Sequence, residues 1–404
     1  MSLIVQKYGG TSVGDAEKIR NVARRIIATK QAGNDVVVVV SAMGDTTDDL
    51  VKLAYQVTDK PSERELDVLL STGEIVASTL LAMALKGMGY EAISLSGAQA
   101  GIQTDANHNR ARILNIEPGR IVQEIKNGCV VIVAGFQGIT KDSDVTTLGR
   151  GGSDTTAVAL AASLGARVCE RYTDVEGIYT ADPRVVPEAT KLKEISYDEM
   201  LELATYGSKV MHPRAVELGQ IYNIPILVAS SFNDHAGTLI HGGLMEIRNK
   251  VTAITQDMDV AKITIVGVPD RPGIAAAIFA PLSKAGVSVD TIVQNASSKH
   301  ITDLTFTVTK GDAEKALEVV KPLAESIGAR ECVIDTKLGK VSIIGSGMQN
   351  TPGYAATMFS TLSAAGINIQ LITTSEIRIT VIIDENKVKE AVKALHKAFE
   401  LEKE

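Results

Sequence analysis

Short runs of β-branched residues alternate with longer amphipathic stretches along roughly the first 225 residues of the chain. The short runs are apolar on both faces, which is typical of strands in a parallel sheet that helices cover on each side. We expect strands at residues 3–6, 36–40, 92–95, 130–134, 167–172 and 226–229, and helices at 16–32, 63–88 and 155–164. The pattern therefore predicts an α/β domain, a three-layer sandwich around a mainly parallel sheet, over residues 1–245.

The pattern changes after about residue 245, where the chain contains an internal repeat. Residues 262–267 (KITIVG) correspond to residues 340–345 (KVSIIG), and a Pro-Gly pair follows each copy. Both copies have the order strand, turn, helix, strand, strand, helix, with proline near the start of the first helix. We expect two small α+β modules at 262–336 and 340–404, the first with a longer connection at 294–303.

Composition narrows the function classes. The hydrophobic share of 45% and the charged share of 22% are those of a folded soluble protein. The net charge of −7, the 4% aromatic content and the absence of tryptophan argue against a nucleic-acid surface. The apolar runs are too short to span a bilayer, and no secretory signal opens the chain. We therefore expect a cytoplasmic protein without nucleic-acid or membrane partners.

The three cysteines are widely spaced and form no CxxC pair. Cys129 and Cys169 lie in or beside strand-like runs, where a buried, reduced thiol is the ordinary interpretation. An odd cysteine count also suits a reducing compartment. There is no histidine-rich or cysteine-rich cluster of the kind that binds zinc, and His212 is more often structural than catalytic in such a setting.

Two glycine-rich turns each precede a predicted helix. Residues 7–14 (KYGGTSVG) place Lys7 at a strand end before Gly9 and Gly10. Bare glycine permits close backbone approach, and a helix N-terminus attracts phosphate. The string fits neither GxxxxGK[ST] nor GxGxxG, which excludes a P-loop and a dinucleotide fingerprint. By itself the turn could still be a plain strand-to-helix connection.

Residues 147–156 (TLGRGGSDTT) form the second turn, with Ser153 or Asp154 expected as the helix N-cap. Arg150 provides a planar cation suited to a carboxylate or phosphate. Alternatively, Asp154 only caps the helix and Arg150 is a solvated loop charge. Two such turns in one sheet domain, each beside a cation, favour a binding role over this alternative.

Two further segments leave their roles open. Residues 172–184 follow a strand and are expected at the carboxyl edge of the sheet, where ligands bind, or form an ordered surface loop. Residues 71–74 (STGE) interrupt a helical run, and Glu74 lies among apolar neighbours. That carboxylate is then either exposed on the helix or held by a cationic ligand.

These strings resemble the aspartate kinase branch of the amino-acid kinase family. The matching strings are KYGGTSVG at 7–14, SAMGDTTDDL at 41–50, STGE at 71–74, GRGGSDTTAVALAA at 149–162, YTDVEGIYTADPR at 172–184 and YGSKVMHPRAVE at 206–217. The C-terminal pair is similar to the tandem ACT domains of the same enzymes, with DRPG at 270–273, QN at 294–295 and TSEI at 374–377. The likeness covers nearly the whole chain. Ile75 after STGE departs from the polar residue of many relatives, and Tyr354-Ala355 fills positions where some relatives have threonine.

The resemblance implies an ATP-dependent kinase whose Mg²⁺ is carried by ATP rather than by a protein metal site. It implies a catalytic role for Lys7, Arg150 and Asp154. It implies ATP binding by Lys7, Tyr8, Gly9, Gly10, Ser41, Thr173, Asp174, Tyr179, Arg184, Lys209 and Val210. It implies substrate binding by Thr47, Glu74, Arg150, Gly151, Gly152 and Ser153, with Arg150 on the α-carboxylate of aspartate and Glu74 on its ammonium group.

The chemistry implied is phosphorylation of the aspartate side chain to 4-phospho-L-aspartate, a first step toward lysine, threonine and methionine. A side-chain carboxylate of pKa about 3.9 is already ionised, so no general base is required. The site must instead overcome repulsion between two anions with positive charge and alignment. The alternatives are a kinase for another acidic amino acid and an inactive amino-acid sensor of the same fold.

The resemblance also implies regulation by lysine, threonine or both, bound to the ACT domains. The candidate effector positions are Asp270, Gly273, Ala275, Gln294, Asn295, Asn368 and Ile369. Alternatively, the modules only join subunits through their sheets. We expect a homodimer or higher oligomer, and a start near Met245 would yield an ACT-only partner subunit.

Overall fold

The chain forms two compact units. The computed structural model describes residues 2–243, 251–295, 301–349 and 351–403. The first unit holds Met1–Tyr179, Lys191–Thr205 and Lys209–Met245, and the second holds Thr180–Thr190, Tyr206–Ser208 and Glu246–Glu404. Two short segments of the expected sandwich sequence thus belong to the second unit. The domain limit expected at residue 245, and the start expected near Met245, lie outside the described residues.

An eight-stranded sheet forms the centre of the first unit, and all of its neighbouring strands are parallel except β11 and β12. Its order is β10 (Glu194–Ser196), β12 (Thr238–His241), β11 (Ile226–Ser230), β9 (Val168–Thr173), β1 (Leu3–Tyr8), β2 (Asp35–Val40), β6 (Val130–Ala134) and β3 (Ala92–Leu95). The six strands predicted from apolar runs are all present, which confirms the mainly parallel sandwich. The runs are buried on both faces because helices cover both sides.

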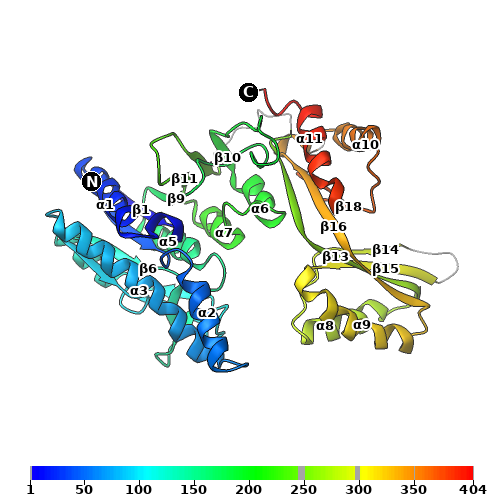
Figure 1. Cartoon of the computed structure of the whole chain (residues 1–404), viewed down its shortest axis with the longest axis horizontal. Coiled ribbons are helices and arrows are strands. Elements are labelled where there is room, and N and C mark those ends of the chain that lie inside the picture. The colour runs from blue at the N-terminus through cyan, green and yellow to red at the C-terminus, as the bar shows by residue number, and fades with distance from the viewer. Residues whose placement is uncertain (1, 244–250, 296–300, 350, 404) are drawn as a thin grey trace. The chain divides into compact units, whose positions relative to one another are not determined.

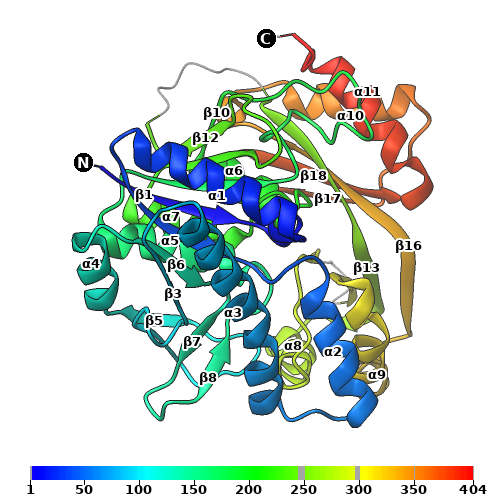
Figure 2. The same ribbon diagram turned by 60° about the vertical axis from the view of Figure 1, so that its left-hand side comes forward.

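Helices cover each face of this sheet in the first unit (Figure 2). One face packs on α1 (Ala16–Gln31) and α3 (Glu63–Gly87), and the other packs on α5 (Gly152–Leu164), which contacts α7 (Pro213–Tyr222). Side chains alternate along a strand. Tyr8 therefore belongs to the core beneath α1, and Lys7 reaches α5. The remaining helices of the unit are α2 (Thr46–Val57), α4 (Gly119–Lys126) and α6 (Tyr197–Thr205).

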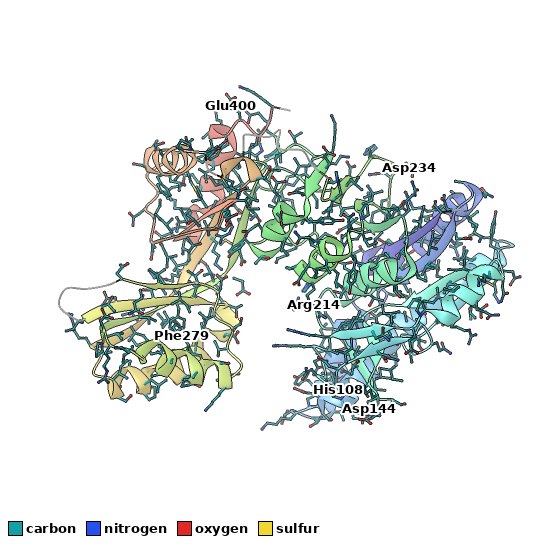
Figure 3. The ribbon with its side chains drawn as sticks, turned by 180° about the vertical axis from the view of Figure 1, so that it is seen from behind. His108, Asp144, Arg214, Asp234, Phe279 and Glu400 are labelled. Carbon is teal, nitrogen blue, oxygen red and sulfur yellow. The ribbon has the colours of Figure 1, made fainter. Side chains whose placement is uncertain are left out.

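The apolar pattern did not predict a second, four-stranded sheet in this unit. Its order is β5 (Ile113–Ile116), β4 (Ile102–Thr104), β7 (Gln137–Ile139) and β8 (Val145–Thr147). Asp67 of α3 holds it in place from a fully buried position. The carboxylate accepts hydrogen bonds from Thr147 Oγ1 and from the backbone N–H of Asn109, and it lies 2.8 Å from His108 Nδ1. His108 is labelled in Figure 3.

α3 is the only helix among the described residues that is long and apolar enough to cross a membrane. Half of its apolar window is buried inside the unit. Length and composition alone are weak evidence for a membrane span, because a core helix meets the same criteria.

A six-stranded antiparallel sheet forms the second unit. Its order is β14 (Ile292–Gln294), β15 (Ile301–Val308), β13 (Ala253–Pro269), β16 (Glu331–Ile344), β18 (Arg378–Asp384) and β17 (Leu371–Thr374). β13 and β16 are long and pair along most of their length, and Figure 1 shows them side by side. The helices α8 (Ile274–Lys284) and α9 (Ala313–Ser326) pack near one end of this pair, and α10 (Tyr354–Ala364) and α11 (Val388–Ala398) near the other.

The two repeats have the predicted order of elements, and they also exchange strands. Residues 331–338 of β16 extend the sheet of the first repeat, and residues 253–257 of β13 extend the sheet of the second. The second repeat is thus completed by a strand that precedes the first one in sequence. The 3₁₀ helices η2 (Lys310–Asp312), η3 (Ser346–Met348) and η4 (Glu385–Lys387) complete the unit. The longer connection expected at 294–303 lies partly outside the described residues.

Candidate active site

Three charged side chains meet beneath the first turn of α5. Lys7 of β1 lies opposite Arg171 of β9 in the parallel register, and Asp154 lies on α5. Lys7 Nζ is 2.7 Å from Asp154 Oδ1, and Arg171 Nε donates to Asp154 Oδ2 over 3.1 Å. Burial would raise the pKa of Asp154, but the charges of Arg171 and Lys7 lower it to about 2. The site therefore contains two buried cations held around one carboxylate.

The pKa of Lys7 is lowered, first by burial and then by the charge of Arg171, while Asp154 opposes the change. Burial deprives the ammonium group of Lys7 of water, and the carboxylate of Asp154 offsets part of that loss. Asp154 Oδ1 is buried and makes no directed hydrogen bond, so its 2.7 Å approach to Lys7 is a close ion pair.

Glu74 is the second buried acid of the site. It lies on α3, and its Oε1 accepts a hydrogen bond of 3.0 Å from the backbone N–H of Ala42, the second residue after β2. Its Oε2 is buried and has no hydrogen-bond partner among the described residues. Burial raises the pKa of Glu74 to about 7, although the bond from Ala42 and the charge of Lys7 act in the opposite direction.

The interpretation of Glu74 as an exposed helical residue is wrong, because its side chain is buried. The STGE string also does not break the helix, since α3 continues through Gly73. A Cβ atom at Gly73 would lie 2.8 Å from Ala42 Cβ, so glycine is needed for close packing of α3 against the end of β2. The close packing places Glu74 beside the backbone that follows β2.

The first glycine-rich turn meets the chain after β2. Gly9 N donates to Tyr172 O, and Gly44 N donates to Gly10 O over 3.1 Å. A Cβ at Gly10 would lie 2.8 Å from Ala42 O. The turn continues as a four-residue 3₁₀ helix, η1 (Gly10–Val13), and α1 starts only at Ala16 after its Asp15 N-cap. The helix expected at residues 16–32 is thus present as α1, and a 3₁₀ turn separates it from Gly9 and Gly10.

The second glycine-rich turn begins α5. Gly149 and Gly151 adopt positive φ angles of 74° and 70°, which favour glycine. The expected N-cap at Ser153 or Asp154 is wrong, because Gly151 is the N-cap and both residues are buried in the first helical turn. The exposed Arg150 lies between the two glycines and has no ion-pair partner among the described residues.

α7 supports this turn from behind. A Cβ at Gly151 would lie 2.2 Å from the ring of His212, and His212 Nδ1 accepts from Arg214 N as the N-cap of α7. Arg214, labelled in Figure 3, donates to the carbonyl oxygens of Leu148 and Ala111. These contacts agree with the structural role that the sequence favoured for His212.

The other predicted ligands of the first unit lie at strand ends and loops. Ser41 follows β2, and its N–H donates to Tyr8 O. Thr47 lies half-buried in the first turn of α2. Thr173 ends β9, and its hydroxyl donates to the carboxylate of the exposed Asp174. Tyr8 itself is fully buried, with its ring stacked on Tyr172, so that only its backbone is available to a ligand.

Three predicted nucleotide ligands lie farther along the chain. Tyr179 forms an isolated bridge with Lys191, and Lys209 is exposed with Val210 half-buried after it. Arg184 belongs to the second unit, where its guanidinium pairs with Asp182. The structure therefore brings together Lys7, Glu74, Asp154 and both glycine turns in the first unit. Arg184 belongs to the second unit.

The effector candidates are spread over the second unit. Asp270, Gly273 and Ala275 lie at the start of α8, Gln294 and Asn295 lie at the end of β14, and Asn368 and Ile369 precede β17. A separate pocket of about 250 Å³ lies in the second repeat. Its lining includes Pro352, Gly353, Tyr354 and residues 374–376 of the TSEI string, and no effector candidate lines it.

The sequence analysis missed two features of the site. Arg171 lies inside a predicted strand and has no motif around it. Its position opposite Lys7 marks it as a site residue, but that position is known only from the strand order. The backbone N–H of Ala42 carries no sequence signal at all. Cys169 is buried as predicted, Cys129 is half-buried, and no disulfide joins the three cysteines.

Comparison with known proteins gives the class of the protein. The amino acid kinase family matches residues 2–230, and two ACT domain families match residues 262–325 and 341–399. The fold and these matches define a kinase with two C-terminal ACT domains.

Full-length relatives narrow the class. An aspartokinase of Mycolicibacterium smegmatis is 51% identical over 407 residues, which are 99% of this chain and 97% of the relative. An aspartate kinase of Pseudomonas putida is 50% identical over 404 residues, which are 100% of this chain and 98% of the relative. The chain therefore belongs to the aspartokinases of the amino acid kinase family.

A solved structure agrees with the fold. E. coli aspartokinase III in complex with aspartate and ADP is 26% identical, with a TM-score of 0.81 over 98% of this chain and 99% of that chain. The same enzyme in complex with lysine and aspartate has a TM-score of 0.77 at 25% identity.

Proposed function

We propose that this protein transfers the γ-phosphoryl group of ATP to the side-chain carboxylate of L-aspartate and forms 4-phospho-L-aspartate. The observation that carries the proposal is the pairing of a buried, half-satisfied Glu74 carboxylate with the Lys7–Asp154–Arg171 cluster. An amino acid with two carboxylates and one ammonium group needs one anionic and several cationic or N–H contacts. The aspartokinase names of the full-length relatives and the aspartate and ADP of the E. coli complex support the same substrate.

The residues fit this division of charge. Glu74 Oε2 has an unused acceptor for the substrate ammonium group. Arg150 is exposed without an ion-pair partner among the described residues, and its planar guanidinium suits the α-carboxylate. Thr47, Gly151, Gly152 and Ser153 would complete the aspartate site.

ATP would bind beside the same cluster. The glycine turn at residues 9–10 lies beside Lys7 and would offer backbone N–H groups to phosphate, and the end of β9 would supply Thr173 and Asp174. When bound, ATP would supply the phosphoryl group, and its Mg²⁺ would offset part of the negative charge of the phosphates. Lys7 would stabilise the charge that develops on the phosphoryl oxygens, and Asp154, which pairs with it over 2.7 Å, would hold Lys7 in position. Tyr179, Arg184, Lys209 and Val210 would contact the rest of the nucleotide.

Regulation and cellular role extend this proposal. The reaction would be the first step toward lysine, threonine and methionine in the cytoplasm. Lysine, threonine or both would bind at the ACT domains, as the lysine complex of E. coli aspartokinase III suggests. The active protein would be a homodimer or higher oligomer joined through the ACT domains. An ACT-only chain starting near Met245 would be a further partner.

Trapping the acyl phosphate as a hydroxamate tests the function directly. The full-length protein is incubated with Mg-ATP and aspartate, glutamate or acetylglutamate, each with and without lysine and threonine. Product with aspartate alone is the expected result, and suppression by an added amino acid identifies the effector. Product only with another acceptor, or none with any, would contradict the proposal.

Replacing Lys7 tests its assigned role. Lys7→Met should lower kcat by roughly a hundredfold or more, because a preorganised charge on the phosphoryl group is lost, with a modest change in ATP affinity. Lys18→Met is the matched control, since the side chain of Lys18 is 40% exposed and its ion pair among the described residues is with the neighbouring Asp15. Turnover of Lys7→Met close to that of the control would remove Lys7 from the mechanism.

A further inference from the structure

Arg171 is a second cation at the centre of the candidate active site. It lies directly opposite Lys7 on the neighbouring parallel strand, so both side chains leave the same face of the sheet. Its Nε is 3.1 Å from Asp154 Oδ2, while Lys7 Nζ is 2.7 Å from Asp154 Oδ1. The three side chains are 12%, 7% and 7% exposed for Arg171, Lys7 and Asp154. Each carboxylate oxygen thus has its own cation.

The charge count of this cluster depends on Arg171. Lys7 and Asp154 alone form a neutral pair, and Arg171 makes the cluster positive by one unit. The buried neighbour Cys169 does not offset this charge, because burial raises the pKa of its thiol. Glu170 does not offset it either, since its side chain bonds to Gln6 and Tyr172 on the other face of the sheet. The proposed reaction brings two anions together here, which a neutral pair would not favour.

The guanidinium also has an unused donor. Arg171 Nη1 is buried and has no hydrogen-bond partner among the described residues. Buried polar groups are nearly always satisfied, and arginine presents five N–H donors in a fixed fork. An unsatisfied arginine nitrogen next to Lys7 is therefore a feature that an anionic ligand would complete.

We propose that Arg171 is a positioning residue of the phosphoryl-transfer site, which binds one oxygen of Asp154 and gives the Lys7–Asp154–Arg171 cluster a net positive charge for the phosphate groups of ATP. Without Arg171, Lys7 alone would have to neutralise Asp154 and would offer less charge to the phosphoryl oxygens. This role rests on the proposed function, because it concerns the same phosphoryl transfer.

The competing explanation is that Arg171 only ties β9 to α5. A tie of this kind affects stability, but it does not require positive charge beyond what holds Asp154. The two explanations differ in whether charge, hydrogen bonding or shape at position 171 determines the rate.

Four variants of the full chain separate these explanations. Arg171→Met removes charge and donors, Arg171→Gln keeps a donor without charge, and Arg171→Lys keeps the charge. Arg167→Met is the matched control, because Arg167 is an exposed arginine directly before β9. For each variant we would measure kcat, the KM values for ATP and aspartate, the calorimetric Kd of Mg-ATP, and thermal unfolding.

The expected result is a fall in kcat of about tenfold to a hundredfold in Arg171→Met and Arg171→Gln, smaller than direct loss of a phosphoryl-contacting donor. Mg-ATP binding should weaken by about three- to tenfold, with KM for aspartate within about threefold of wild type. Arg171→Lys should recover most of both losses, and Arg167→Met should match wild type.

Several results would overturn the proposal. One is a folded Arg171→Met variant with kcat and Mg-ATP affinity within twofold of wild type. Another is full recovery by Arg171→Gln, which would show that charge is irrelevant. Failure of both uncharged variants to fold while Arg171→Lys is stable would assign the positive charge at position 171 to structure instead. Failure of wild type to phosphorylate aspartate would contradict the proposed function, and the Mg-ATP binding measurements would still decide the role of Arg171.

Discussion

The two ACT repeats share one order of elements, but they pack against different parts of the chain. The core of the first repeat consists of residues between Ala261 and Ile334. The core of the second repeat also contains Ala181, Val185 and Val186, which come from the sequence of the kinase half. The two repeats match in sequence, but only the core of the second contains side chains from the kinase half.

Polar contacts strengthen this difference. The carbonyl oxygen of Thr180 accepts from Ile254 N over 2.7 Å, and its hydroxyl lies 3.0 Å from His396 Nε2 of α11. The ring of Tyr206 lies under the guanidinium of Arg378 at 3.7 Å, with Lys340 Nζ 5.9 Å away. Every one of these partners in the regulatory sequence belongs to the second repeat or to the strand that completes it.

The difference suggests which repeat can influence nucleotide binding. Thr180 directly follows Tyr179, and Lys209 directly follows Ser208, so two proposed ATP ligands are covalent neighbours of segments that pack on the second repeat. A change in the core of the second repeat should therefore alter ATP binding more than the same change in the first.

The largest expected effect comes from equivalent core positions. Ile278 and Met358 occupy matching places in α8 and α10, and both are fully buried. Replacing either with alanine should destabilise its repeat by about 2–5 kcal/mol, because a large buried side chain leaves a cavity. Denaturant unfolding would measure this loss. Only Met358→Ala should also raise KM for ATP, and an equal rise in Ile278→Ala would remove the distinction between the repeats.

A smaller effect is expected at Tyr206. Tyr206→Leu removes the ring beneath the nearly buried Arg378, a contact worth up to about 2 kcal/mol when desolvated. Denaturant unfolding and KM for ATP would both be measured, and both should shift. Tyr222→Leu is the control, since this exposed tyrosine on α7 should change stability by at most about 0.5 kcal/mol. No difference between the two variants would show that the cation–π contact does not anchor the segment.

The smallest effect concerns pH. Burial lowers the pKa of His396, and Glu402 and Glu188 oppose this only in part. The unfolded chain then binds more protons than the folded chain as pH falls below the ordinary histidine value of about 6.5, so stability should fall on acidification through that range. Unfolding measured between pH 7 and pH 5 should show a shallower slope in His396→Gln than in wild type. An equal slope in His396→Gln and wild type would contradict this prediction.

Sequence patterns predicted those elements whose burial is strong and local. The six strands were predictable because both of their faces are apolar, and the repeats were predictable from their matching glycines and prolines. The small sheet around β4 was not, because its strands have three or four residues and are too short to show a period. The exchange of strands between the repeats was also not predictable, since β13 and β16 pair over a range that crosses both repeats.

The sequence predicted those site residues that lie beside glycines, and it did not predict the one inside a strand. Lys7, Arg150 and Asp154 stood beside glycines that marked them, whereas Arg171 stood in an ordinary strand pattern. That Arg171 lies next to Lys7 became clear only from the register between β1 and β9. Gly73 was misread as an interruption because a glycine inside a helix usually weakens it, but here it permits contact with Ala42.

The strand exchange has a consequence for synthesis. Residues 253–257 leave the ribosome before the first repeat, but their sheet partner, residues 340–344, emerges only after that repeat is complete. Until then the early half of β13 is an unpaired edge, which is a template for aggregation. Chains that stop between the repeats should therefore be less soluble than chains that extend through β18, because only the longer chain can cover that edge.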